Sequence, residues 1–271
     1  MCDEFDITKV KIKSEYVEAF DFEVFDALRV HGLVVKYRPV MFCVVGLYLL
    51  GIHFGQKWMR NRPAFQLNGL LFFWNISLAL FSIMATVRGY PETFHLLSQP
   101  RGFYKAVCSQ DSTNYATVFW GWLYMLSKIV ELGDTAFIIL RKQKLIVLHW
   151  FHHICMVIGC WIAAEYVPAA GRMYFVNCFV HSFMYSYYAL KALKFQIPKR
   201  VSMALTMLQI VQMILGVLGV FFTAGMLYLG VPCRLNMHLV YMGATMASAF
   251  LALFINFFAR TYLQSGKRKI H

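Results

Sequence analysis

Four histidines stand at helical spacing in two apolar segments of the chain. His149, His152 and His153 form an H-x-x-H-H sequence, and His181 lies in the next apolar segment, four residues after Asn177. Residues three and four apart share one face of a helix, so each set is expected to present its polar groups together. Ionisable side chains are costly inside a membrane and usually face a cavity, which makes these histidines the first candidates for chemistry.

Two further apolar segments, 112–140 and 201–233, carry polar residues at helical spacing, and two tyrosines continue the spacing of Asn177 and His181. These residues are Lys128, Glu131, Asp134, Thr135, Tyr185, Tyr188, Thr206, Gln209 and Gln212. Counting about 1.5 Å per residue from the nearest basic cluster places Asp134, the histidines and Gln209 roughly 8 to 15 Å inside one membrane edge. Four segments are therefore predicted to bring polar groups to one depth, below a ring of basic residues formed by Arg141, Lys142, Lys144, Lys191 and Lys194.

Nucleophilic catalysis by histidine fits this arrangement. An imidazole held in a low dielectric stays neutral, and its unprotonated nitrogen can attack a thioester to give an activated acyl-imidazole. Asp134 or Asn177 would orient the ring, and a second substrate would then receive the acyl group. The basic ring would bind a phosphorylated carrier such as coenzyme A, whose phosphates cannot enter hydrocarbon.

Other interpretations remain open. The polar groups can serve only as interhelical hydrogen bonds, or Cys155, Cys160 or Cys178 can be the nucleophile if its pKa is lowered. Histidine boxes also occur in metal-dependent membrane desaturases and hydroxylases, but one box is short of ligands for two irons, although a single Zn²⁺ could use three histidines and Asp134. We therefore expect no metal. A lipid transporter or a seven-helix receptor is the non-enzymatic alternative.

The composition assigns these segments to a membrane protein. Of the 271 residues, 59% are hydrophobic and only 14% are charged, against roughly 25% charged residues in soluble domains. About 20 apolar residues cross a bilayer as a helix. We predict an all-α polytopic membrane protein with seven transmembrane helices, at residues 39–56, 63–87, 112–140, 145–164, 173–190, 201–233 and 235–259.

The charges indicate the orientation. The net charge is +13, and fourteen Lys and Arg residues follow the first, third, fifth and seventh segments, whereas five follow the second, fourth and sixth. By the positive-inside rule the C-terminus is predicted to be cytosolic and the N-terminus lumenal. Because the basic residues lie at membrane edges, we expect no nucleic-acid partner.

Three regions are predicted along the chain. Residues 1–38 form a lumenal arm, 39–264 the catalytic membrane domain and 265–271 a cytosolic tail, in which Lys267 and Lys269 match a dilysine signal for retrieval to the endoplasmic reticulum. Residues 88–111 are expected to form the one long loop within the bundle. Cys108 and Cys233 lie in the two longer non-cytoplasmic loops, where an oxidising lumen would favour a disulfide; two unpaired thiols are the alternative.

Four motifs in order make the sequence resemble the ELO family of very-long-chain fatty acid elongases over about residues 39–264. They are K-x-x-E-x-x-D-T at 128–135, H-x-x-H-H at 149–153, H-x-x-M-Y-x-Y-Y at 181–188 and T-x-x-Q-x-x-Q at 206–212. Trp150 within the histidine box resembles the branch that prefers saturated and monounsaturated chains.

The resemblance implies a 3-oxoacyl-CoA synthase of the endoplasmic reticulum membrane. Such an enzyme condenses a long-chain acyl-CoA with malonyl-CoA, releases CO₂ and CoA, and needs no cofactor. The family's fold has helices 2 to 7 in a barrel-like bundle around a closed-ended acyl tunnel, whose far end a Cys108–Cys233 bond would help to close. The implied partners are membrane lipid and the other enzymes of the microsomal elongation cycle, with homo-oligomerisation left open.

The resemblance also distributes roles among the site residues. His152 would accept the acyl group, His149 and His153 would support it, and His181 would assist decarboxylation or proton transfer. The remaining motif and basic residues would contact the substrates and their CoA carriers; they are Lys128, Glu131, Arg141, Lys142, Lys144, Tyr185, Tyr188, Thr206, Gln209 and Gln212.

Overall fold

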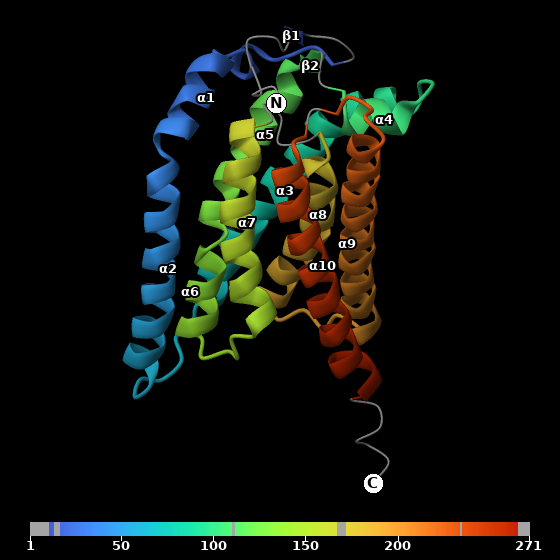
Figure 1. The fold of residues 1–271 in the computed structure, drawn as a ribbon. Helices are drawn as coiled ribbons and strands as arrows, with labels where there is room; N and C mark the ends of the chain where they lie inside the picture. Colours follow the sequence, from blue (N-terminus) through green and yellow to red (C-terminus); the bar gives the residue numbers. More distant parts are fainter. Residues whose placement is uncertain (1–10, 14–16, 110–111, 167–171, 234, 265–271) are drawn as a thin grey trace.

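Long helices that run roughly side by side form most of the structure (Figure 1). The computed structural model describes residues 11–13, 17–109, 112–166, 172–233 and 235–264. Its α-helices are α1 (Ala27–Lys36), α2 (Arg38–Met59), α3 (Asn68–Leu97), α4 (Gly102–Val107), α5 (Tyr115–Val130), α6 (Gly133–Leu140), α7 (Val147–Tyr166), α8 (Tyr174–Ala192), α9 (Lys199–Tyr228) and α10 (Met237–Phe258). The short elements are β1 (Lys11–Lys13), the 3-10 helix η2 (Asp21–Glu23), β2 (Ser112–Asn114) and the π-helix η3 (Ala259–Leu263). β1 and β2 pair in parallel, with Ile12 opposite Thr113.

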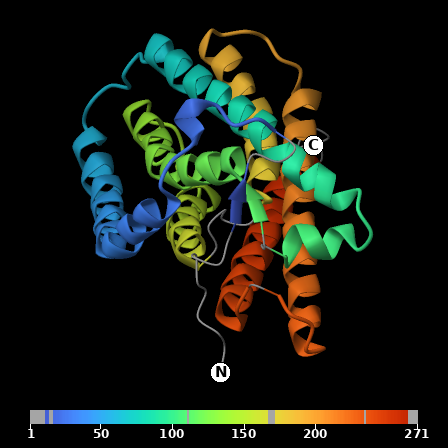
Figure 2. The same ribbon diagram turned by 90° about the horizontal axis from the view of Figure 1, so that it is seen from above.

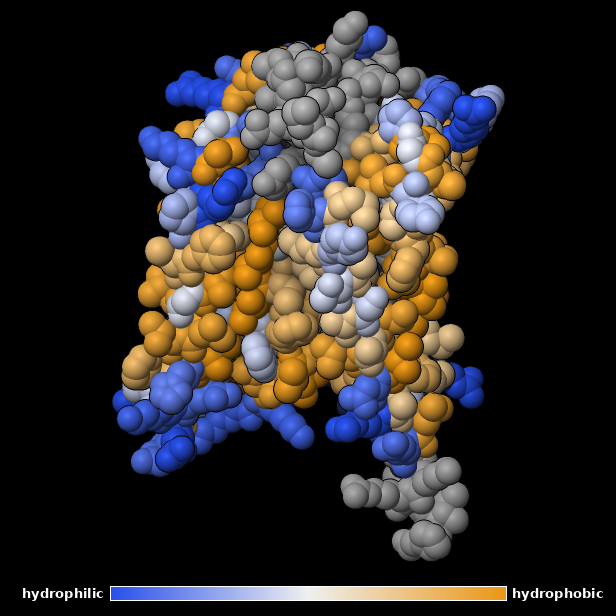
Figure 3. Space-filling view, viewed as in Figure 1, coloured by the Kyte–Doolittle hydropathy of each residue, from blue (hydrophilic) through white to orange (hydrophobic). Residues whose placement is uncertain are grey.

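Five helices in the described part of the chain are long and apolar enough to cross a membrane, namely α2, α3, α7, α9 and α10 with η3. Their most apolar windows have a mean hydropathy between 1.5 and 2.2. On the face shown in Figure 3, apolar side chains cover most of the middle of the bundle, and hydrophilic side chains gather at its two ends. The protein is therefore an all-α, multi-pass membrane protein. The count of seven spans stays a prediction, because α5, α6 and α8 do not meet the same criteria.

The expected helix at residues 112–140 is interrupted. It consists of β2, α5 and α6. In the turn between the two helices, Asp134 N donates to the carbonyl of Glu131, three residues earlier, at 3.1 Å. Gly133 allows the indole of Trp74 to pack there, since a Cβ atom on residue 133 would lie 2.6 Å from two of its ring carbons. The prediction of one continuous helix was wrong on this point, because the chain turns between Val130 and Gly133.

The predicted long loop at 88–111 is mostly helical. α3 continues past Arg88 and through Pro91 to Leu97, and α4 follows after a short turn. The prediction ended the helix at the first charge, but the Arg88 guanidinium donates to the buried carboxylate of Glu23. A charge that is paired in this way does not have to mark the end of a helix.

Seen along the helix axes, α2 stands beside the remaining long helices (Figure 2). α3 packs along α8 and α9 packs along α10, whereas α2 contacts mainly α6 and α7. Only 6% of the apolar window of α2 is buried, against 28% for α3 and 33% for α7. The connections 60–67, 141–146 and 193–198 and the end of η3 all lie at one end of the bundle (Figure 1), and they carry the basic residues of the sequence pattern.

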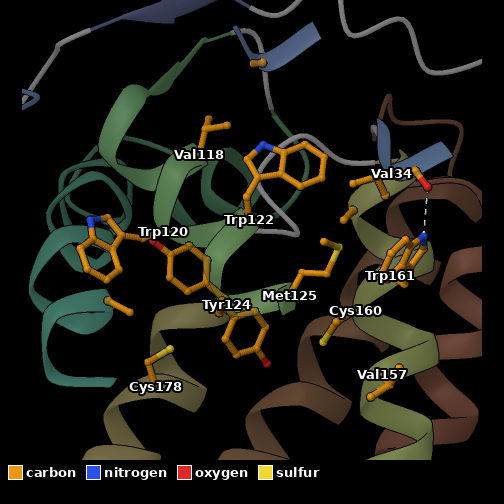
Figure 4. Close-up of a cluster of buried hydrophobic side chains, with 14 of the residues drawn as sticks. Val34, Val118, Trp120, Trp122, Tyr124, Met125, Val157, Cys160, Trp161 and Cys178 are labelled. Atoms are coloured by element: carbon orange, nitrogen blue, oxygen red, sulfur yellow. Dashed lines mark hydrogen bonds between the residues drawn. The ribbon is translucent and has the colours of Figure 1, made fainter. Parts of the chain in front are cut away.

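A cluster of buried side chains fills the other half of the bundle (Figure 4). Trp120, Trp122 and Tyr124 come from α5, and Trp161 comes from α7. The Trp161 Nε1–H donates to the carbonyl of Val34 on α1, at 3.2 Å. The buried aromatic rings and thiols of this cluster pack the space between these helices.

The N-terminal arm is held on this half by charged groups. Glu23 is fully buried, and it accepts hydrogen bonds from Arg88 Nε and Trp120 Nε1, both at 2.8 Å. Burial alone would raise the pKa of Glu23, but the hydrogen bonds from Arg88, the Phe20 backbone and Trp120 hold it below its ordinary value.

A second buried pair joins Arg172 Nε to Glu92 Oε1 at 2.6 Å.

Replacing Glu23 with glutamine is expected to destabilise the fold by about 3 to 5 kcal/mol at pH 7, because it leaves Arg88 without its buried counter-charge. The lowered pKa of Glu23 means that the carboxylate stabilises the fold above its ordinary pKa, and that this stabilisation is lost as the pH falls through the folded-state pKa. Thermal unfolding in detergent at pH 7 and at acidic pH measures both effects. Asp21→Asn, an exposed acid in the same turn, is the control. Equal melting temperatures for the two variants at pH 7 would contradict the assignment.

Cys108 and Cys233 form a disulfide. It joins the end of α4 to the connection between α9 and α10, with the two Cα atoms 4.4 Å apart and a sequence separation of 125. The bond lies at the same end of the bundle as the N-terminal arm (Figure 1). The four cysteines found free in the described chain are Cys43, Cys155, Cys160 and Cys178.

Candidate active site

A cavity of about 510 Å³ lies between α3, α6, α7, α8, α9 and α10. Most of its lining is apolar, and its polar lining contains the majority of the residues that the sequence motifs predicted. Those residues are Asp134, Arg141, His149, His152, His153, Asn177, His181, Tyr185, Tyr188, Gln209 and Gln212. The helices thus bring together polar side chains from segments that are far apart in the sequence.

All four predicted histidines line this cavity. The spacing on α7 stacks His149 beside His153, with ring centroids 4.4 Å apart, and puts the His152 ring 5.6 Å from that of His153. His181 on α8 lies beside Tyr185, at 5.4 Å between ring centroids. Two helices therefore supply imidazoles to one space, as the spacing predicted.

His152 differs from two of the other histidines in its polar contacts. His149 Nε2 lies 3.0 Å from Thr135 Oγ1, and His181 Nδ1 lies 3.7 Å from Glu131 Oε2. Among the described residues, no hydrogen-bonding partner is found for His152, whose ring packs against Phe250 at 5.0 Å. Its ring nitrogens are therefore available to a substrate in the cavity.

Asp134 is held from two sides. Trp74 Nε1 donates to Oδ1 at 2.6 Å, and the Tyr185 hydroxyl donates to Oδ2 at 2.9 Å. Asp134 or Asn177 was predicted to orient an imidazole, but the polar groups that contact histidine rings are Thr135 and Glu131. The turn between α5 and α6 explains the difference, since it directs Asp134 towards α3 and α8.

Behind the cavity wall lies a buried polar network. Lys128 Nζ donates to Glu131 Oε1 at 2.7 Å and to Asn177 Oδ1 at 3.1 Å, and the Ser127 hydroxyl donates to Glu131 Oε1 at 3.0 Å. The second oxygen of Glu131 faces His181. Lys128 and Glu131, predicted to bind substrate, do not line the cavity and instead brace Asn177 and His181, which do.

Several other predicted residues lie away from the cavity. Lys142 and Lys144 are exposed and do not line it, and Lys142 Nζ donates to the carbonyl of Arg60 at 3.1 Å. Thr206 is also absent from the lining and faces the Tyr262 hydroxyl at 3.3 Å, whereas Gln209, which lines the cavity, donates to Met184 Sδ at 3.4 Å. The predicted retrieval lysines, Lys267 and Lys269, lie outside the described residues.

The structure adds residues that the motifs did not indicate. Asn75 and Gln143 line the cavity, and Trp74 fixes Asp134. Asn75 carried a signal, because it is a polar residue in the middle of an otherwise apolar span. Trp74 carried none, since an indole next to Asn75 is equally compatible with lipid contact.

Among the described residues, neither a group of metal ligands nor a cysteine nucleophile is found in the cavity lining. In the described part of the chain, no three His, Cys, Asp or Glu side chains are grouped as metal ligands would be. Cys155, Cys160 and Cys178 are absent from the lining. The geometry therefore favours imidazole chemistry next to two basic side chains, Arg141 and Lys191, that also line the cavity.

Comparison with known proteins finds close relatives. The family described as ELO: GNS1/SUR4 matches residues 33–270. Very long chain fatty acid elongase 6 of Drosophila melanogaster is 41% identical over 266 residues, which cover 96% of this chain and 84% of the relative. Very long chain fatty acid elongase 3 of Mus musculus is 37% identical over 256 residues, or 93% of each chain. Putative fatty acid elongase 4 of Caenorhabditis elegans is 40% identical over 243 residues, covering 88% of this chain and 82% of the relative.

Proposed function

This chain belongs to the ELO (GNS1/SUR4) family, and from that premise we propose that it is a fatty acid elongase acting as a very-long-chain 3-oxoacyl-CoA synthase. It condenses a long-chain acyl-CoA with malonyl-CoA and releases CO₂ and CoA. The observation that carries the proposal is the cavity in which four histidines from α7 and α8 face apolar side chains, with Arg141 and Lys191 in the same lining.

The reaction proceeds in two steps through His152. An unprotonated ring nitrogen attacks the thioester carbon of acyl-CoA, the C–S bond breaks, and CoA leaves as its thiol with the proton that the imidazole gives up. Malonyl-CoA then loses CO₂, and the resulting carbanion attacks the acyl carbon. The new C–C bond forms as the acyl–nitrogen bond breaks, and the departing imidazolate takes up one proton from solvent, which returns the neutral imidazole.

His152 is the preferred acyl acceptor because its ring is more accessible than that of His153 and has no hydrogen-bonding partner among the described residues. His149 and His153 support it on the same helix. His181 stands on α8 beside Tyr185, with Glu131 behind it, and assists decarboxylation of malonyl-CoA. No cofactor is required for either step.

The two ends of the cavity suit the two parts of an acyl-CoA. Side chains such as Met213, Val180 and Phe254 provide apolar surface for the acyl chain. The CoA phosphates stay outside hydrocarbon and pair with Arg141 and Lys191, while Gln209 and Gln212 supply hydrogen bonds between these regions. The acyl chain of this substrate is saturated or monounsaturated, in line with Trp150 in the histidine box.

The helices support a proposed arrangement with seven membrane spans. α5 with α6, and α8, serve as the two remaining spans, and α3 to α10 enclose a tunnel that the aromatic cluster of Figure 4 closes. At about 1.5 Å per residue, the 16 residues of α5 and the 8 of α6 have a summed helical length of roughly 36 Å, against about 30 Å for a bilayer core. The protein lies in the endoplasmic reticulum membrane with its N-terminus lumenal, and works with the other enzymes of the elongation cycle.

Incubation of the purified protein with a long-chain acyl-CoA alone is expected to add the acyl mass to the peptide that contains residues 149–153. Peptide mass spectrometry measures the increment, and later addition of malonyl-CoA is expected to remove it and to yield 3-oxoacyl-CoA. Product formation without an adduct would replace the two steps by a concerted condensation. The absence of both adduct and product would overturn the proposed function.

A further inference from the structure

The outlying helix α2 reaches the candidate site through one hydroxyl group. Of the five candidate membrane-spanning helices in the described chain, α2 has the smallest buried share, and most of its side chains face outwards. Tyr48, near its middle, is half-buried, and its hydroxyl lies 2.7 Å from Thr135 Oγ1 on α6. Thr135 is only 2% exposed. A helix that contributes nothing to the cavity lining is therefore hydrogen-bonded to a residue next to it.

Thr135 continues the contact to a histidine. Its Oγ1 lies 3.0 Å from His149 Nε2, so Tyr48, Thr135 and His149 form a chain of three groups from three helices. A threonine hydroxyl has one proton to donate. The phenol is a stronger acid than an alkyl hydroxyl, so the favoured direction is from Tyr48 to Thr135 and from Thr135 to Nε2.

We propose that Tyr48 is a positioning residue, which acts through Thr135 to hold His149 with Nε2 unprotonated and with its ring proton on Nδ1. Because the Thr135 proton is committed to Nε2, the ring keeps one orientation and one tautomer. His149 in turn packs on His153, at 4.4 Å between ring centroids. The effect on catalysis rests on the proposed function, whereas the tautomer itself does not.

Other contacts hold α2 in place without Tyr48. Arg38 Nε, at its beginning, donates to Glu165 Oε1 on α7 at 2.9 Å. Met41 and Met59 near its ends are buried, and Gly55 approaches α6 so closely that an added Cβ would lie 3.4 Å from Ile139. Removing one hydroxyl is therefore expected to free His149 without detaching the helix.

The kinetic test uses Tyr48→Phe, Thr135→Val and the double variant, with Tyr241→Phe as the matched control on an exposed face of α10. A neutral hydrogen bond contributes about 0.5 to 1.5 kcal/mol, so Tyr48→Phe is expected to lower kcat about 2- to 12-fold with little change in KM. The double variant is expected to be no slower than Thr135→Val, and Thr135→Ser to recover most of what valine loses. Multiplicative losses in the double variant, or an equal loss in Tyr241→Phe, would overturn the proposal.

A spectroscopic test reads the tautomer directly, whether or not the protein condenses acyl chains. Protein labelled with ¹⁵N in its histidine rings gives separate signals for protonated and unprotonated nitrogens, and the signals lost in His149→Gln identify this residue. We expect a single tautomer in the wild type and a mixture in Tyr48→Phe, at an unchanged melting temperature. An unchanged tautomer in Tyr48→Phe would refute the positioning role, while a wild type inactive in condensation would refute only the proposed function.

Discussion

Replacing His152 with alanine is expected to lower the rate of condensation at least about a thousandfold, because the acyl group loses its covalent acceptor and no other nucleophile replaces it. The ring lies in the cavity wall without a hydrogen-bonding partner among the described residues, so its removal leaves no buried group unsatisfied. Thermal unfolding in detergent is therefore expected to change little. Production of 3-oxoacyl-CoA from labelled malonyl-CoA measures the rate, and the acyl adduct on the 149–153 peptide is expected to disappear.

His238→Ala provides the matched control, since His238 is exposed and lies outside the cavity lining. It is expected to keep full activity. If His152→Ala retains more than a few per cent of the wild-type rate together with the adduct, the covalent role belongs to another histidine. Residual activity without any adduct would instead support a concerted reaction.

Substitution of Arg141 or Lys191 by glutamine is expected to raise the KM for both CoA substrates about tenfold or more, with a smaller effect on kcat. Both side chains line the cavity, and a hydrogen bond to a charged group contributes about 1.5 to 3 kcal/mol. The loss appears in KM because the phosphates are bound equally in the ground and transition states. Steady-state kinetics with each CoA substrate measure the split.

Lys142→Gln is the control for this prediction. Lys142 adjoins Arg141 in sequence and carries the same charge, but its ammonium group bonds to the Arg60 carbonyl and does not line the cavity. We expect its KM values to stay within about twofold of the wild type. An equal rise in KM for Lys142→Gln and Arg141→Gln would show that only the overall positive charge of this end matters.

Much of the helical pattern could be predicted from the sequence. The predicted segments 39–56, 145–164 and 235–259 lie within a few residues of α2, α7 and α10. Absence of charge was a sufficient signal there, since these helices face an apolar environment. It failed where partners are distant in sequence, as Arg88 inside α3 is balanced by Glu23 and Trp74 packs closely at Gly133, where α6 begins.

The candidate site, too, could be predicted from the sequence only in part. Helical spacing and depth predicted that the histidines of α7 and His181 lie close together, and all four line the same cavity. Spacing within a segment cannot show which neighbouring helix a side chain meets, so the pairing of Asp134 with Trp74 and of Thr135 with Tyr48 required the structure. For the same reason, the sequence could not show that Arg141 lines the cavity while the nearby Lys142 and Lys144 do not.

The disulfide between Cys108 and Cys233 turns the middle of the polypeptide into a covalent ring. Every histidine of the site lies within this ring, as do both glutamines of α9, while α2, α3 and α10 are attached to it from outside. A single proteolytic cut inside the ring, for example in the 193–198 connection between α8 and α9, therefore leaves one molecule that separates into two fragments only after reduction. The catalytic half of the chain remains joined to both of its ends even when its backbone is broken once.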